Sequence, residues 1–93
     1  MVIVILEYLV PLDRIEAALD DHREWLGRHY DAGDFVASGP RTPRTGGVII
    51  AECSAEKALE AVASDPFALQ GLAKHQVLEF VPSRVSPENW AHV

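Results

Sequence analysis

The chain has 93 residues, which is the length of one small domain. Its 14 acidic and 8 basic residues give a net charge of −6, which disfavours nucleic acid and anionic membranes as partners, because both attract clustered Lys and Arg. No apolar stretch approaches the roughly 18 residues that a membrane span needs, and the single cysteine, Cys53, excludes an intrachain disulfide and a thiolate metal cluster.

The N-terminal half predicts a strand, a long helix and a second strand. Residues 2–10 begin with an aliphatic run that is apolar on both faces, as in a central strand, and that lacks the basic leader of a secretory signal. Pro11 ends this strand, and Asp13 is placed to cap a helix over residues 14–31, which is followed by a short strand over residues 35–38. Side chains at three- and four-residue spacing give the helix one buried stripe, made of Ile15, Ala18, Leu19, His22, Trp25, Leu26, His29 and Tyr30.

The C-terminal half predicts a strand, a helix and a last strand. The predicted elements are a loop over residues 41–47, a strand over 48–51, a helix over 54–64 capped by Ser54, and a strand over 76–81. Asp65 and Pro66 end this helix and start a short turn, with Asp65 as its N-cap. Residues 1–82 are therefore expected to form one domain, followed by a C-terminal tail over residues 83–93 that contains Trp90.

The element order β-α-β-β-α-β predicts an α+β domain of the ferredoxin-like, split-βαβ kind. Such a domain has an antiparallel four-stranded sheet with both helices on one face, which leaves the other face open. A chain of this length buries only about 60% of its unfolded surface, yet 48% of its residues are apolar. We therefore expect a second copy to cover the open face, giving a homodimer or a higher oligomer.

His22 is the first candidate for chemistry, because it lies in the apolar stripe of the first helix. Such a histidine is either a structural group with a satisfied hydrogen bond or an acid/base group tuned by burial and a neighbouring carboxylate. His29 lies one heptad further along, near the helix end, and is interpreted as structural.

Asp65 is the second candidate, and its simplest role is the N-cap before Pro66. Capping uses only part of a carboxylate, so the remaining lone pairs could accept a hydrogen bond from His22 and fix its tautomer. Sequence spacing alone leaves both roles open.

The turn after the second strand supplies the candidate binding residues. Ser38 and Gly39 offer a hydroxyl and backbone groups, and Arg41 and Arg44 could contact an anionic substrate or simply be solvated. The sequence contains no G-x-S-x-G, H-x-x-x-H or C-x-x-C motif, and His75 and His92 have no partners at metal-ligand spacing. Neither a serine hydrolase nor a metal site is expected.

In combination these motifs resemble the YCII-related family, whose fold is a dimeric α/β-barrel. The resemblance spans nearly the whole chain and rests on His22, Gly33, Ala37-Ser38-Gly39-Pro40, Asp65-Pro66-Phe67 and Gly71-Leu72. It implies that His22 and Asp65 form an active-site pair and that Ser38 lines the same cleft. Arg23 departs from the family pattern, in which leucine commonly follows the histidine.

Three functions are compatible with these observations. The first is a cytoplasmic enzyme of lyase, isomerase or hydrolase type, in which His22 moves a proton on a small ring substrate without metal or organic cofactor, Asp65 orients it, and Ser38, Gly39 and Arg41 bind the substrate. The second is a non-catalytic oligomeric module that binds a small ligand or serves as an accessory subunit. The third, a haem-binding or oxygen-using member of the same superfamily, ranks last.

Overall fold

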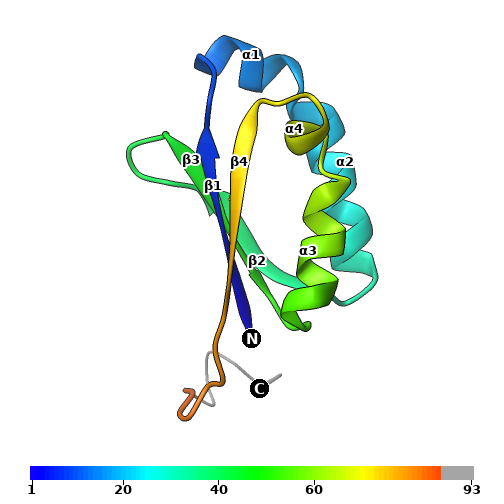
Figure 1. The fold of residues 1–93 in the computed structure, drawn as a ribbon, viewed down its shortest axis with the longest axis vertical. Helices are drawn as coiled ribbons and strands as arrows, with labels where there is room; N and C mark the ends of the chain where they lie inside the picture. Colours follow the sequence, from blue (N-terminus) through cyan, green and yellow to red (C-terminus); the bar gives the residue numbers. More distant parts are fainter. Residues whose placement is uncertain (87–93) are drawn as a thin grey trace.

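The computed structural model of the chain describes residues 1–86, so Trp90, His92 and most of the predicted tail lie outside the described residues. Eight elements are arranged as a four-stranded antiparallel sheet with helices against one face (Figure 1). They are β1 (Val2–Tyr8), α1 (Leu12–Ala17), α2 (Leu19–Asp31), β2 (Phe35–Pro40), β3 (Gly46–Ala51), α3 (Ala55–Ala63), α4 (Pro66–Leu69) and β4 (Ala73–Glu79). The ferredoxin-like α+β fold expected from the element order is confirmed.

The sheet has the strand order β2-β3-β1-β4, which makes β1 a central strand, as its aliphatic run predicts. Alternate residues of β1 point to opposite faces. Val2, Val4 and Leu6 face the helices and are buried, whereas Ile3 and Ile5 lie on the open face and remain partly exposed. The register brings His75 of β4 opposite Leu6, on the face that the helices cover.

The core lies between the sheet and the two long helices. Trp25 of α2 is fully buried at its centre, and its indole N–H donates to the carbonyl oxygen of Ala61 and to the hydroxyl of Ser64, at 3.2 and 3.0 Å. These bonds join α2 to the end of α3. The apolar side chains of both helices and of the sheet pack around this indole.

The long first helix is in fact two helices that meet at Ala18. The φ of −103° at Ala18 ends α1, and α2 begins at the next residue. Asp13 was expected to cap this segment, and that prediction is wrong. The cap position is taken by Pro11, whose carbonyl oxygen already accepts from the amides of Arg14 and Ile15, so Asp13 lies within the first turn.

The other cap predictions are confirmed. Ser54 accepts from the amide of Lys57 at 3.1 Å, and Asp65 accepts from the amide of Phe67 at 3.0 Å with Pro66 at the first helical position. None of the helices described within residues 1–86 has the length and apolar character needed to cross a membrane.

Each of the four strands differs from the prediction in at least one limit. β1 ends at Tyr8 rather than at residue 10, and β2 continues to Pro40 rather than ending at residue 38. β3 begins at Gly46 rather than at residue 48, because Gly46 and Gly47 still pair with β1. A side chain at Gly46 would overlap the backbone carbonyl of Leu6, so this close pairing needs glycine. β4 covers residues 73–79 rather than 76–81, because it pairs with β1 along its whole length, from Val2 to Tyr8.

Candidate active site

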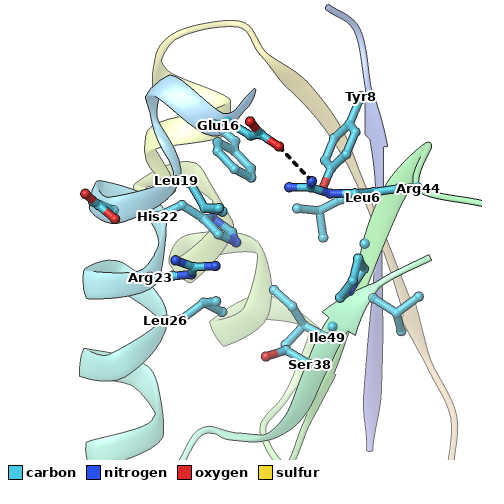
Figure 2. A pocket seen from close by; sticks show the side chains of 16 residues that line it. Leu6, Tyr8, Glu16, Leu19, His22, Arg23, Leu26, Ser38, Arg44 and Ile49 are labelled. Atoms are coloured by element: carbon cyan, nitrogen blue, oxygen red, sulfur yellow. Dashed lines mark hydrogen bonds and ion pairs between the residues drawn. The ribbon is translucent and has the colours of Figure 1, made fainter. Parts of the chain in front are cut away.

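A cavity of about 730 Å³ opens between α2 and the strands β2 and β3 (Figure 2). This volume is in the range of small-molecule sites. Its wall combines an apolar surface with a few polar and charged groups. The lining residues are Leu6, Tyr8, Glu16, Leu19, Asp20, His22, Arg23, Leu26, Ser38, Gly39, Pro40, Arg44, Gly47, Val48, Ile49 and Phe67.

His22 projects from α2 towards this pocket and is only 8% exposed (Figure 2). Its imidazole lies parallel to the ring of Phe67, with ring centroids 4.0 Å apart and an angle of 5° between the planes. Its Nδ1 atom is 2.8 Å from Oδ1 of Asp65. The described residues provide no hydrogen-bond partner for the other ring nitrogen, Nε2, so that atom remains for a ligand in the pocket.

Asp65 is fully buried and receives three hydrogen bonds. Its Oδ1 atom accepts from His22 and from the amide of Phe67, and its Oδ2 atom lies 2.7 Å from Nε2 of His75. Burial alone would raise the pKa of the Asp65 carboxyl, but the hydrogen bonds from His22, His75 and Phe67 hold that pKa below its ordinary value. The group is therefore a carboxylate at neutral pH, and a carboxylate only accepts hydrogen bonds.

The structure thus brings His22 and Asp65 together across 43 positions of sequence and adds a third member, His75. His75 was set aside in the sequence because it has no partner at metal-ligand spacing. The predicted last strand began at residue 76, so His75 fell just outside it. In the structure β4 begins at Ala73, and His75 shares a face with Ala73 and Val77.

Of the three predicted binding residues, two line the pocket and one does not. Ser38 and Gly39 line the pocket, and the Ser38 hydroxyl shares a 2.7 Å hydrogen bond with the hydroxyl of Tyr30. Arg41 is exposed and is not among the lining residues. β2 ends at Pro40, so Arg41 lies beyond the strand whose residues line the pocket.

Arg44 lines the pocket in place of Arg41. Its guanidinium lies 3.0 Å from the carboxylate of Glu16, which raises the pKa of Arg44, and Tyr8 adds a further hydrogen bond that acts in the same direction (Figure 2). Arg23 also lines the pocket, and within residues 1–86 it makes no ion pair. Among the described residues, the pocket therefore has one guanidinium whose charge is paired with a carboxylate, that of Arg44, and one without an ion-pair partner, that of Arg23.

A second His–Asp contact lies outside the pocket. His29 is 3.5 Å from Asp34, which also pairs with the ammonium group of Lys57 at 2.9 Å, and Lys57 lowers the pKa of Asp34. Cys53 is partly buried, and burial raises the pKa of its thiol, as expected for a structural rather than a nucleophilic cysteine. Among residues 1–86, no group of three or more His, Cys, Asp and Glu side chains is arranged to hold a metal ion.

Comparison with known proteins agrees with the fold and with the resemblance noted in the sequence. The model of the YCII-related domain family matches residues 1–81. Among solved structures, the chain is similar to 5-chloro-2-hydroxyhydroquinone dehydrochlorinase from Burkholderia phenoliruptrix in complex with 2,5-dihydroxybenzoquinone. The TM-score is 0.71 at 21% identity, covering 87% of this chain and 94% of that one. No curated protein matches the chain.

Proposed function

The chain belongs to the YCII-related family, and on this basis we propose that it is an enzyme that moves a proton on a small ring substrate. The observation that carries the proposal is the arrangement of His22: one ring nitrogen is held by a buried carboxylate and the other is open to a pocket. This is the geometry that a general acid/base needs. The proposed reaction is of lyase, isomerase or hydrolase type and uses neither a metal nor an organic cofactor.

In this proposal, Nε2 of His22 accepts a proton from a carbon or hydroxyl of the substrate. The imidazolium then returns that proton to another substrate atom, to a leaving group or to water, which restores the neutral base. Asp65 keeps the proton on Nδ1 before the reaction and stabilises the imidazolium during it, as carboxylates do beside other catalytic histidines. Ser38 and the backbone of Gly39, on the opposite wall, would orient a substrate oxygen.

The pocket favours a small, flat, oxygen-bearing substrate. Its apolar surface, with Leu19, Leu26 and Ile49, suits a ring, and the Arg23 guanidinium suits a hydroxyl or phenolate oxygen. The similar dehydrochlorinase was solved with 2,5-dihydroxybenzoquinone, a molecule of this kind. We therefore propose a polyhydroxylated or quinonoid ring as the substrate class, and elimination or tautomerisation as the reaction.

The test compares wild-type protein with His22→Ala on a panel that includes 5-chloro-2-hydroxyhydroquinone, followed by absorbance and by chloride release. Loss of a general acid/base should lower kcat by about 100- to 10,000-fold, while circular dichroism shows a retained fold. His29→Ala is the matched control, because His29 lies on the same helix and also contacts an aspartate, but does not line the pocket. Equal turnover by wild type and His22→Ala would refute the proposal.

The alternative is a non-catalytic module that binds a small ligand, and the complete burial of Asp65 favours it, since a sealed carboxylate can be purely structural. On this alternative, the folded protein binds 2,5-dihydroxybenzoquinone without converting any ring on the panel. His22→Ala would then chiefly lower the melting temperature, because the buried carboxylate loses a donor.

A further inference from the structure

We infer that His75 is a positioning residue, which acts on the substrate through Asp65 and His22 by holding the carboxylate in one orientation. The inference rests on the proposed function of His22 and deepens it. It concerns a residue on β4 that does not line the pocket and lies 53 positions from His22 in the sequence.

The two oxygens of Asp65 are held by different parts of the fold. Oδ1 accepts from His22 on α2 and from the amide of Phe67 on α4. Oδ2 accepts from His75 on β4, at 2.7 Å, and among the described residues no other side chain donates to it. The plane of the carboxylate is therefore fixed by the helices α2 and α4 at one oxygen and by β4 of the sheet at the other.

The ionised state of Asp65 determines both histidine tautomers. A carboxylate has no proton to give, so each short contact requires an N–H on the histidine. His22 must carry its proton on Nδ1, which leaves Nε2 as a free base facing the pocket, and His75 must carry its proton on Nε2. The catalytically useful tautomer of His22 thus depends on where Oδ1 points.

Without His75, Oδ2 would be a buried charged oxygen without a side-chain donor, since Asp65 is fully buried and His75 is itself 6% exposed. Rotation of the carboxylate would then let Oδ2 compete with Oδ1 for His22 and for the amide of Phe67. His22 would lose its single orientation and its single tautomer. Preorganisation of this kind affects turnover more than substrate binding.

The experiment uses nitrogen-15 NMR of the imidazole rings, which distinguishes the tautomers independently of any activity. In the wild-type protein at a pH where the rings are neutral, we expect the Nδ1–H tautomer at His22 and the Nε2–H tautomer at His75. Finding His75 with an unprotonated Nε2 would overturn the inference directly, in protein that is already folded.

Three variants complete the test. His75→Leu should give a mixture of His22 tautomers and lower kcat by about 10- to 100-fold with little change in KM. His75→Gln, whose amide N–H can reach the same oxygen, should restore most of the single His22 tautomer and most of kcat. Val77 lies on the same face of β4, and Val77→Ala loses only packing. It should change neither the His22 tautomer nor kcat.

The outcomes separate this inference from the proposed function. A disturbed His22 tautomer in His75→Leu, together with normal turnover by His22→Ala, would leave the positioning role intact and remove the catalytic one. An undisturbed tautomer and an unchanged kcat in folded His75→Leu would remove the positioning role, whatever His22→Ala does. If His75→Leu does not fold, the wild-type tautomers and the His75→Gln variant decide.

Discussion

At the scale of single residues, Asp65 combines two roles that the sequence presents as alternatives. It caps α4 through the amide of Phe67 and also accepts from two histidines. An ionised carboxylate without access to water is costly unless donors surround it. Three donors, from α2, α4 and β4, offset that cost, and they also link the elements on which they lie.

Asp65 should make the stability of the protein sensitive to acid. Its pKa is lower in the folded than in the unfolded chain, so its contribution is fully present above the unfolded value of about 4 and is lost as the pH falls through the folded value. Asp65→Asn should lower the free energy of unfolding by about 1–3 kcal/mol at pH 7 and weaken its dependence on pH below 4. Urea unfolding at pH values from about 2.5 to about 7, which span the pKa of an unfolded carboxyl group, measures both the free energy of unfolding and its dependence on pH.

Asp34 provides the comparison for this measurement, because Lys57 lowers its pKa as well. Asp34→Asn should remove a separate part of the acid sensitivity, and the two effects should add, since the sites share no partner. An acid profile of Asp65→Asn that matches wild type would contradict the role given to the buried carboxylate.

The candidate site could be predicted from sequence only in part. The apolar stripe singles out His22, and the Asp-Pro pair singles out Asp65, but only the family resemblance joins them. His75 could not be assigned, because its role depends on the register of β4 against β1, which sets the face that it occupies. A slip of one residue would have turned it away from Asp65.

At the scale of secondary-structure elements, two glycines at the start of β3 let this strand pair closely with β1. Gly46 pairs with Glu7 and lies against the carbonyl of Leu6, where a side chain has no room. The pair Gly46-Gly47 looks like part of a loop in the sequence. Its function is to let β3 pair closely with β1 at the end of the sheet near the pocket, which Gly47 helps to line.

Gly46→Ala should therefore be strongly destabilising, by about 1–3 kcal/mol or more, as in other overpacked sites. Gly27→Ala is the matched control: Gly27 lies in the interior of α2, and a methyl group there meets nothing within 4 Å. That substitution should stabilise the protein by about 0.5–1 kcal/mol, because alanine is the better helix former. Thermal unfolding of both variants decides, and a Gly46→Ala variant as stable as wild type would show that β1 and β3 can separate.

The order and type of the elements could be predicted from sequence, because hydrophobic periodicity distinguishes β1 from the stripe of α2. The break at Ala18 could not, since the apolar stripe continues through it without interruption: Ile15, Ala18 and His22 are all buried on the same side. Hydrophobic periodicity shows which side of a helix is buried. It does not reveal a break between two helices when the same side stays buried in both.

At the scale of the whole molecule, one face of the sheet has no helix packed against it within the described part of the chain. Figure 1 shows the helices on the other face. Aliphatic side chains from three strands lie on the open face; they include Ile3, Ile5, Val48, Ile50 and Leu78. Leu78, near the end of β4, is 45% exposed.

We propose that a second copy covers this face. Sedimentation velocity should show a dimer at micromolar concentration, and Ile50→Glu should shift it to monomer, because a buried carboxylate without a partner opposes association. Leu59→Glu is the control, since Leu59 is exposed on α3, away from the open face, and should leave the dimer intact. A monomeric wild-type protein would contradict the proposal.

The parallel stacking of His22 on Phe67 has a magnetic consequence. An aromatic ring current shields nuclei held above its face, and the His22 ring lies there at 4.0 Å. The carbon-bound protons of His22 should therefore resonate upfield of those of His75, on which no ring is stacked among the described residues. Each imidazole at Asp65 should thus have its own signal, so that the state of either can be followed in the intact protein without a substrate.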